Sequence, residues 1–338
     1  MRAVGFHKPL PIEDDQSLLD LTLPDPVPGP RDLLVRVRAV SVNPVDTKVR
    51  MRANPQDGQP QVLGYDAAGL VEAVGPEVTR FKAGDAVFYA GALGRSGTNA
   101  ELHLVDERIV GAKPATLSFA EAAAMPLTAI TAWEALFDRL DLRKPVPGAA
   151  PALLIVGGAG GVGSMATQLA RQLTDLTVIA TASRPETAEW SRTLGAHHVI
   201  DHTKPLAAEV AALGLGAPGF VFSTTHTDRH LPEIGKLIAP QGRFALIDDP
   251  ASLDVLSFKQ KSVSTHWEFM FTRSMFATAD MGAQGDLLDA VSRLVEAGTL
   301  TTTVAEQFGA ISAANLRRAH ALIESGRAKG KIVLEGWA

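Results

Sequence analysis

The sequence contains no cysteine in its 338 residues. This absence excludes disulfide bonds and thiolate metal sites, and it fits a reducing compartment. Long apolar runs are also missing, since no stretch reaches the roughly 18 residues that a membrane-spanning helix needs. The segment from Met1 to Leu10 carries charge and proline where a signal peptide needs an apolar centre. We therefore expect a soluble, cytoplasmic protein that does not insert in a membrane.

Basic residues are not in excess either. The formal net charge is −5 and no long basic run occurs, which argues against nucleic acid as a partner. No G-x-S-x-G sequence is present, so a serine-hydrolase nucleophile elbow is not expected. Tyrosine is scarce, with only Tyr65 and Tyr89. What the chain has is 46% hydrophobic residues and 30 glycines, which is typical of an α/β enzyme, and its length suggests two domains.

The most informative stretch is ALLIVGGAGGVGSMATQLARQL, residues 152–173. A short apolar run of strand type leads into a glycine cluster, and apolar residues then recur at helical spacing. Three of the glycines fit G-x-G-x-x-G, a pattern that permits a tight turn, the approach of a pyrophosphate and close packing of helix on strand. An ordinary glycine-rich turn is the alternative. If the pattern binds a dinucleotide, the contacts come from Gly158, Gly160, Gly161, Val162 and Gly163.

The next predicted strand, residues 177–182, ends in Ser183 and Arg184, about twenty residues beyond the glycines, where this pattern places the ribose-binding residue. NAD sites usually carry Asp or Glu there, but no carboxylate occurs between Val178 and Pro185. A guanidinium pairs well with phosphate. We therefore predict NADPH as the cofactor. A solvated surface charge is the alternative for Arg184.

The first 125 residues have the pattern of β structure with frequent turns, which predicts a compact barrel-like domain. Residues 33–42 alternate as a half-buried strand. They end in the turn Asn43-Pro44-Val45-Asp46, which is followed by a charged segment. Residues 118–135 are helical with an interruption at Pro126, and we interpret them as the crossing between domains.

Beyond residue 150, strands and helices alternate, which predicts parallel strands with helices on both faces. Because ligands bind beyond the carboxyl ends of such strands, Ser223 is a further candidate cofactor contact. The fold class is α/β, and the expected domains are 1–126 with 279–338, and 127–278. Strands are predicted at 152–156, 177–182, 198–200, 220–222, 244–247, 262–266 and 331–334, and helices at 186–194, 206–213, 231–237, 280–298 and 312–326.

Seven stretches carry a resemblance to a known family: Val42 to Asp46, GYDAAGLVEAVG (64–75), FKAGDAVF (81–88), SGTNAEL (96–102), the glycine loop, LGAHHVID (194–201) and AKGKIVLEG (328–336). Together they resemble the medium-chain dehydrogenase/reductase superfamily over nearly the whole chain. The resemblance is closest to zinc-type alcohol dehydrogenase-like proteins, similar to quinone reductases of the zeta-crystallin type. It implies a Rossmann-type doubly wound parallel sheet at 127–278, a GroES-like catalytic domain formed by the rest, and a homodimer.

The residues depart from those of the zinc enzymes at the metal site. Asn43 stands where the zinc enzymes have a Cys ligand, and Tyr65 and Asp66 replace the His and Glu of their G-H-E motif. Leu127 lies near the third ligand position. A carboxamide and a phenol are poor substitutes for Cys and His at a tetrahedral zinc site. No metal is therefore expected.

Two histidine groups, His197-His198-x-x-x-His202 and His226-x-x-x-His230, have spacings that can bring pairs together. Neither group has a convincing third metal ligand. His197 and His198 lead into a strand, so they point to opposite faces. We expect these histidines to be hydrogen-bonded near the cofactor or to lie at the surface.

The resemblance implies that the nicotinamide lies near Asn43, Tyr65, Thr128 and Thr131, with Lys331 also close to the cofactor. Without zinc as a Lewis acid, hydrogen-bond donors must stabilise the charge that develops on the acceptor oxygen. Such a site suits quinones and α,β-unsaturated carbonyls. The hypothesis is an NADPH-dependent reductase of these small molecules in which Asn43 and Tyr65 donate to the carbonyl, and Tyr65 or water supplies the proton.

Several alternatives stay open at this point. Asn43 could serve only the strand-end turn, Tyr65 could be a packing residue, and Lys331 could be a surface lysine. The aromatic and methionine-rich residues between 269 and 276 could line an acceptor pocket, a subunit contact or the core. For the whole chain, the alternatives are an NADP-dependent alcohol or aldehyde dehydrogenase of the zinc type, and a non-catalytic NADPH-binding protein.

Overall fold

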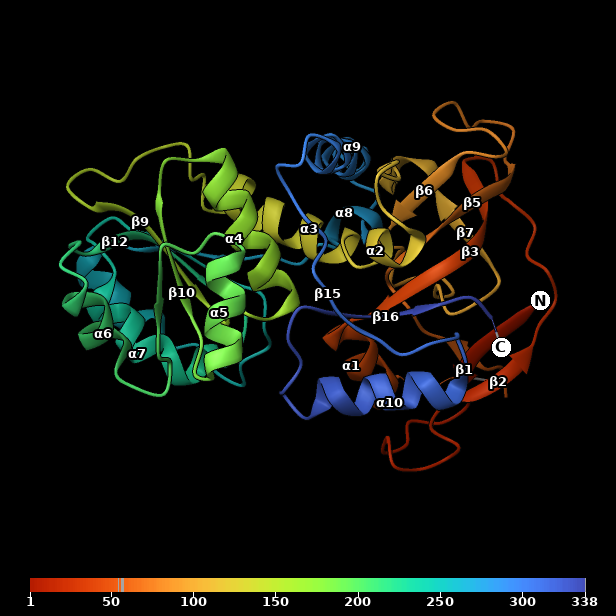
Figure 1. Cartoon of the computed structure of the whole chain (residues 1–338), viewed down its shortest axis with the longest axis horizontal. Helices are drawn as coiled ribbons and strands as arrows, with labels where there is room; N and C mark the ends of the chain where they lie inside the picture. The colour runs from red at the N-terminus through yellow and green to blue at the C-terminus, as the bar shows by residue number, and fades with distance from the viewer. Residues whose placement is uncertain (54, 56–57, 338) are drawn as a thin grey trace. The chain divides into compact units, whose positions relative to one another are not determined.

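The computed structural model describes residues 1–53, 55 and 58–337 (Figure 1). The chain forms two compact units. We call Thr131–Met270 the Rossmann unit, and Met1–Ile130 with Phe271–Ala338 the β-rich unit. One boundary falls within helix α3 (Pro126–Trp133), close to the predicted boundary before residue 127. The other falls before residue 271, whereas the sequence suggested residue 279.

The Rossmann unit is built on a six-stranded sheet in the order β11-β10-β9-β12-β13-β14. Neighbouring strands are parallel, as the alternation of strands and helices predicts. Residues 152–156 of the inner strand β9 are all buried, which explains their continuous apolar run. The strands are β9 (Ala150–Val156), β10 (Thr177–Thr181), β11 (His198–Ile200), β12 (Pro218–Ser223), β13 (Arg243–Leu246) and β14 (Ser264–Trp267).

Helices cover both faces of this sheet. Figure 1 shows α4 and α5 on one face and α6 and α7 on the other. On the second face, Leu206 of α6 and Ile234 of α7 share a buried apolar core with Leu154 of β9. The bounds are α4 (Gly161–Leu173), α5 (Pro185–Thr193), α6 (Leu206–Ala212), α7 (Thr227–Leu237), a π-helical segment (Glu134–Arg139) that follows α3, and a 3₁₀ segment (Val255–Lys261) that precedes β14.

The β-rich unit contains two sheets. In the larger, seven-stranded sheet, β3 pairs with β5, β7 and β16. Leu33, Val35 and Val37 of β3 are buried, which confirms the predicted alternation. The larger sheet contains β3 (Asp32–Val42), β5 (Ala67–Val74), β6 (Ala86–Tyr89), β7 (Leu102–Asp106), β8 (Val110–Ala112), β15 (Val304–Gln307) and β16 (Lys331–Glu335), and the smaller β1 (Arg2–Phe6), β2 (Leu19–Thr22) and β4 (Gln61–Val62).

The segment predicted as a turn and a charged stretch is a helix, α1 (Pro44–Arg52). Asn43 is its N-cap residue in extended conformation, and Pro44 occupies the first helical turn, where proline is favoured. The Asp46 carboxylate accepts the backbone N–H of Asn43 at 2.7 Å. Such reciprocal capping uses N–H groups that the start of a helix leaves unpaired. The sequence N-P-V-D is therefore a helix start.

Most of the other helices of the β-rich unit lie at predicted positions, but the short helix at Thr272–Met275 was not predicted. Residues 118–135 form helices on both sides of an interruption before Pro126, and the helices expected at 280–298 and 312–326 are present. Within the described ranges, no helix is long and apolar enough to cross a membrane. The bounds are α2 (Phe119–Ala123), α8 (Thr272–Met275), α9 (Ala283–Glu296), α10 (Ala313–Glu324) and a 3₁₀ turn (Glu107–Ile109).

Candidate active site

Sheet register brings three distant parts of the β-rich unit together. β16 pairs with β3 so that Ile332 lies opposite Val42, which puts Lys331 beside Asn43. β5 pairs with β3 so that Ala67 lies opposite Val40, and Asp66 directly precedes this strand. Positions 43, 66 and 331 therefore meet at one end of β3. We call Asn43, Asp46, Asp66 and Lys331 the polar cluster.

Lys331 is the cation of the polar cluster. Its side chain is 3% exposed, and Nζ donates to Val42 O at 3.1 Å, to Asp66 Oδ2 at 3.0 Å and to Asn43 Oδ1. An ammonium has three N–H donors, so all of them are used inside the unit. The structure thus contradicts the view of Lys331 as a surface lysine. The expected contact with a cofactor would require one of these bonds to be given up.

Asp66 is the acceptor at the centre of the polar cluster. Besides the bond from Lys331, Oδ2 accepts from Asn43 Nδ2 at 2.8 Å, while Oδ1 accepts the backbone N–H of Leu127 at 2.8 Å. The side chain is fully buried. Burial raises the pKa of Asp66, and the positive charge of Lys331 opposes that rise.

Asp46 is a second buried carboxylate. Its oxygens accept backbone N–H groups of Asn43 at 2.7 Å and Gly64 at 3.0 Å. Burial raises the pKa of Asp46 to about 7, against the effect of these hydrogen bonds and of Lys331. With two carboxyl groups and one ammonium, the cluster carries one more negative than positive charge when every group is ionised. It can therefore hold one proton near neutral pH.

The amide of Asn43 is oriented by this cluster. One Nδ2 hydrogen goes to Asp66 at 2.8 Å, and the other points to Ser41 O at 3.4 Å, which is long for a hydrogen bond. The side chain is 1% exposed. Asn43 is thus more than a turn residue, and only its second, weakly bound hydrogen is available to another acceptor.

Tyr65 lies next to the cluster and differs from the other tyrosine of the chain. It is 1% exposed, and its ring packs edge-on against Phe271 with centroids 5.4 Å apart. No residue in the described part of the chain forms a hydrogen bond with its hydroxyl, whereas the hydroxyl of Tyr89 is 3.1 Å from His103 Nδ1. Buried tyrosine hydroxyls normally find a partner. Tyr65 therefore offers a donor for a bound molecule.

Gly64 sets the backbone conformation before Tyr65, and the charge of Asp46 helps to keep the Tyr65 phenol protonated. Gly64 has φ of +109°, and an added Cβ would lie 2.4 Å from Thr98 Oγ1, so no other residue fits there. The chain consequently turns tightly before Tyr65. Burial raises the pKa of Tyr65, and the negative charge of Asp46 adds to that rise. The phenol keeps its proton at neutral pH and acts as a donor.

The glycine loop of the Rossmann unit joins β9 to α4. A Cβ on Gly163 would lie 2.2 Å from Gly157 O, and one on Gly158 would lie 2.6 Å from Ala180 Cβ. A Cβ on Gly160 would meet only Gly157 O, at 3.5 Å. The packing of the chain itself thus requires Gly158 and Gly163 but not Gly160. The space beside Gly160, at the N-terminus of α4, fits the close approach of a pyrophosphate.

Ser183 and Arg184 follow β10, as the sequence predicts. Ser183 is exposed, and Arg184 is the N-cap residue of α5. Arg184 Nε lies 3.3 Å from Glu186 Oε1, and the two side chains are 40% and 56% exposed. An ion pair as exposed as this one contributes little and can be replaced by a stronger anion. The guanidinium fits a phosphate in this place.

The remaining predicted cofactor residues have buried hydroxyls. Ser223 Oγ lies 2.7 Å from Thr227 Oγ1, which in turn donates to Asp248 Oδ1 at 2.5 Å. Thr128 donates to Met125 O at 3.0 Å. Thr131 lies on the same helix, α3, and is 5% exposed. Ser223 and Thr128 thus have partners inside the fold, and any contact with a cofactor would compete with those bonds.

Some polar residues with close internal partners had no recognised signal in the sequence. Asp46 was part of a predicted turn, although its place as the fourth residue of N-P-V-D is the signal of a helix cap. Asp248 and Thr227 form a hydrogen-bonded pair at the carboxyl end of the Rossmann sheet, at the end of β13 and the start of α7. Glu268 follows β14, is 2% exposed and pairs with Arg139 at 2.8 Å.

Comparison with known proteins identifies the family. The alcohol dehydrogenase GroES-like domain matches residues 29–132, and the zinc-binding dehydrogenase domain matches residues 194–334. A zinc-type alcohol dehydrogenase-like protein of Staphylococcus aureus (strain MSSA476) is 40% identical over 336 residues, which is 99% of each chain. The chain belongs to the medium-chain dehydrogenase/reductase superfamily.

Other members of the superfamily are similar over most of their length. A quinone oxidoreductase of Pseudomonas aeruginosa is 33% identical, with 91% of this chain and 92% of that protein covered. A candidate zinc-dependent alcohol dehydrogenase from Rhizobium etli CFN 42 has a crystal structure with a TM-score of 0.99 and 69% identity, covering 100% of this chain and 98% of that one. These matches confirm the resemblance, the Rossmann sheet and the GroES-like domain, and they make this superfamily member an oxidoreductase.

A further solved member contains a nicotinamide cofactor. It is a mycobacterial protein in complex with NADPH, with a TM-score of 0.81 and 26% identity, and 99% of each chain is covered.

Zinc, which these family descriptions mention, does not fit the residues of this superfamily member. The Oδ1 atom of Asn43, which a metal would need, accepts a hydrogen bond from the Lys331 ammonium. A second cation there would be repelled. In addition, the described residues contain no group of three His, Asp or Glu side chains that could hold a metal ion. The donor set lacks the thiolates and imidazoles that zinc prefers.

Proposed function

We propose that the chain is a zinc-independent, NADPH-dependent oxidoreductase that reduces a quinone or an α,β-unsaturated carbonyl. The observation that carries the proposal is the hydroxyl of Tyr65, which belongs to a buried side chain, has no partner among the described residues and stands beside a cluster whose cation is an ammonium. A donor of this kind can hold a carbonyl oxygen. A Lewis acid is not needed for acceptors that delocalise the incoming charge.

The chemistry divides between cofactor and protein. NADPH, when bound, supplies the hydride. Tyr65 donates its O–H to the acceptor oxygen and so stabilises the negative charge that builds up there, because the raised pKa keeps the phenol protonated. The proton that completes the product comes from Tyr65 or from water.

Asn43 has a more limited part in this proposal than a free donor would have. Its strong bonds to Asp66 and from Lys331 fix the amide plane. The second hydrogen of this fixed amide points to Ser41 O at 3.4 Å, and because that bond is weak, an acceptor oxygen placed on this side can replace Ser41 O at little cost. We therefore propose Asn43 as a second donor whose position depends on the rest of the polar cluster.

The cofactor assignment rests on the glycine loop and on the end of β10. The free space at Gly160 and the unpaired N–H groups of Gly161, Val162 and Gly163 in the first turn of α4 suit a pyrophosphate. Ser183 and Arg184 suit a ribose phosphate, since the end of β10 carries no Asp or Glu at the position that binds free ribose hydroxyls, and the nearby Glu186 is held in an exposed pair with Arg184. The NADPH complex of the mycobacterial relative supports this choice.

The decisive experiment compares Tyr65→Phe with Tyr89→Phe. Oxidation of NADPH is followed with a small quinone, an enone and an aldehyde, each with and without a strong chelator, and NADPH binding is measured separately. Tyr65→Phe should lower kcat for the quinone or enone by roughly 100-fold and leave NADPH binding unchanged, while Tyr89→Phe retains kcat. Unchanged turnover of Tyr65→Phe would remove Tyr65 from the mechanism.

The alternatives predict other outcomes of the same assay. Turnover of the aldehyde alone, abolished by the chelator, would indicate a zinc-type dehydrogenase. Tight NADPH binding without turnover of any acceptor would indicate a binding protein. The homodimer and the cytoplasmic location stay predictions; light scattering on the purified chain tests the first, and fractionation of cells the second.

A further inference from the structure

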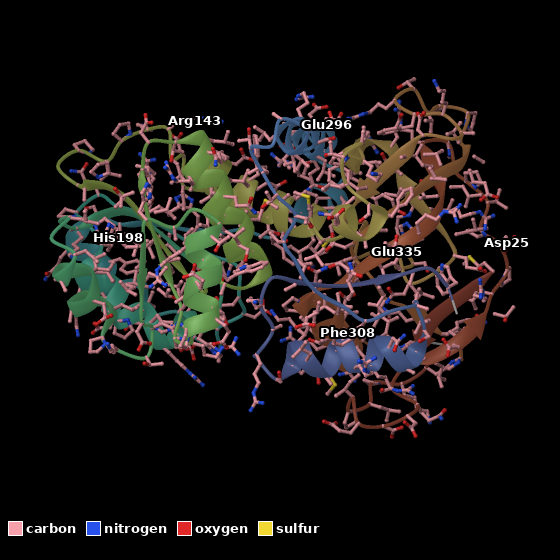
Figure 2. All side chains as sticks on the ribbon, in the orientation of Figure 1. Asp25, Arg143, His198, Glu296, Phe308 and Glu335 are labelled. Carbon is pink, nitrogen blue, oxygen red and sulfur yellow. The ribbon has the colours of Figure 1, made fainter. Side chains whose placement is uncertain are left out.

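Asp46 is the member of the polar cluster that the proposed chemistry leaves without a part. Its side chain is buried. The cluster lies at the start of β16, and Figure 2 labels Glu335 at the opposite end of that strand. A buried carboxylate is costly unless hydrogen bonds compensate for the lost water. The groups that bond to Asp46 therefore indicate what this residue does.

The two oxygens of Asp46 bond to two separate parts of the chain. Oδ2 accepts the backbone N–H of Asn43 at 2.7 Å, and Oδ1 accepts the backbone N–H of Gly64 at 3.0 Å. Asn43 carries one of the two proposed donors. Gly64 directly precedes Tyr65, which carries the other. A single carboxylate thus joins the two backbone segments that present the donors.

Helix capping explains only one of these two bonds. The cap of α2 has the same reciprocal arrangement, in which Glu121 Oε2 accepts the backbone N–H of Ser118 at 2.8 Å. The bond between Asp46 and Gly64 is different, because it joins residues 18 apart in the sequence and ties the start of α1 to the turn before β5. This second bond requires another explanation.

The turn before Tyr65 is held on its other side as well. The backbone N–H of Thr98 donates to Gly64 O at 2.9 Å. Both polar groups of the Gly64 backbone are therefore used, the N–H by Asp46 and the C=O by Thr98. Of these two bonds, the one to Asp46 relates the position of Tyr65 to that of Asn43.

We propose that Asp46 is a positioning residue for the reduction, which sets the spacing of the Asn43 and Tyr65 donors so that both serve one carbonyl oxygen. This inference rests on the proposed function. Donors lower the barrier to charge development only when they are already in place as the charge forms. Asp46 itself touches neither the acceptor nor the cofactor in this proposal and acts through the two backbone segments.

Positioning and electrostatics predict opposite effects of Asp46 on the rate. The negative charge of Asp46 contributes to the raised pKa of Tyr65. Removal of that charge alone would make the phenol a stronger acid and a better donor, and kcat would rise. Asp46→Asn keeps the size of the side chain, but the new Nδ2 cannot accept an N–H, so one of the two backbone bonds is lost. If Asp46 acts by positioning, kcat falls.

The test follows NADPH oxidation with a quinone or enone that the wild type reduces, and measures NADPH affinity by fluorescence titration. Asp46→Asn should lower kcat by roughly tenfold or more and leave NADPH affinity unchanged. Glu121→Gln loses the equivalent cap bond at α2 and is the matched control, so it should retain kcat. In a Tyr65→Phe background, Asp46→Asn should lower kcat by a smaller factor, because one of the positioned donors is already missing.

Three results would overturn this inference alone: an unchanged or higher kcat in Asp46→Asn, an equal loss in Glu121→Gln, and losses that multiply fully in the double variant with Tyr65→Phe. Asp46→Ala removes both acceptor oxygens and should lose at least as much activity as Asp46→Asn. Circular dichroism shows which variants are folded, and either folded Asp46 variant decides the question. A wild type that reduces no acceptor would instead overturn the proposed function, and this inference with it.

Discussion

Replacing Lys331 by methionine tests whether the polar cluster is held together by its single cation. Methionine keeps most of the length of the side chain but removes the charge and three hydrogen bonds, to Val42 O, Asn43 Oδ1 and Asp66 Oδ2. Asp66 is fully buried and would be left without its counter-charge. Removal of one partner of a buried ion pair costs about 3–5 kcal/mol.

This loss should be visible as a lower melting temperature. For a unit of this size, a loss of 3–5 kcal/mol corresponds to a decrease of roughly 6–20 °C. The decrease should grow as the pH rises above about 4. In the variant, the folded-state pKa of Asp66 lies above that of the unfolded chain, so the folded state binds the extra proton and loses stability when the proton leaves.

A second substitution distinguishes electrostatics from packing. Lys331→Met combined with Asp66→Asn removes the uncompensated charge, and at least half of the lost melting temperature should return. Lys204, which is 60% exposed and 3.9 Å from Glu209, is the matched control, and Lys204→Met should melt close to the wild type. Differential scanning calorimetry measures all four proteins. A Lys331→Met variant that melts like the wild type, or no recovery in the double variant, would refute the reasoning.

Three further predictions concern the cofactor loop and the buried carboxylate. Arg184→Ala should weaken NADPH binding by roughly 10–100-fold and NADH binding hardly at all; equal losses, measured by fluorescence titration, would contradict the phosphate assignment. Gly163→Ala should unfold the loop, because its Cβ would lie 2.2 Å from Gly157 O. Gly160→Ala should have a normal melting temperature but a lower affinity for NADPH. A normal NADPH affinity in Gly160→Ala would contradict the pyrophosphate site. Burial raises the pKa of Asp46 to about 7, so the folded state holds a proton that the unfolded chain has already lost at about pH 4. The wild type should therefore lose stability relative to Asp46→Asn as the pH rises from about 4 to about 7. Parallel pH profiles of melting temperature for the two proteins would disprove this.

The Rossmann unit could be predicted from the sequence almost element by element. The inner strands β9 and β12 are buried on both faces and therefore have continuous apolar runs, and each is followed by turn residues and an amphipathic helix. The glycine pattern could be interpreted in the same way, because its meaning depends on local backbone geometry. In the β-rich unit, by contrast, the sequence did not predict strand β15 (Val304–Gln307), because its four residues, VAEQ, have no alternation of apolar side chains.

The polar cluster could not be predicted, because it depends on register between strands that are far apart in the sequence. The spacing from Asn43 to Lys331 contains no sign that β16 pairs with β3. Lysine is rarely buried, so a surface position was as reasonable an expectation for Lys331 as a place near the cofactor. The helix start at Asn43 could have been predicted, because its capping residues are adjacent in the sequence N-P-V-D.

The order of the two units along the chain bears on how the protein forms during synthesis. The Rossmann unit is one continuous segment, Thr131–Met270, and can fold as soon as it leaves the ribosome. The β-rich unit needs β16, which is made after the whole Rossmann unit, to bring Lys331 to Asp66. Until then, the nascent chain has two carboxylates and no ammonium at this place. The Rossmann unit is therefore complete before the unit that carries Tyr65 can assemble its charge pair.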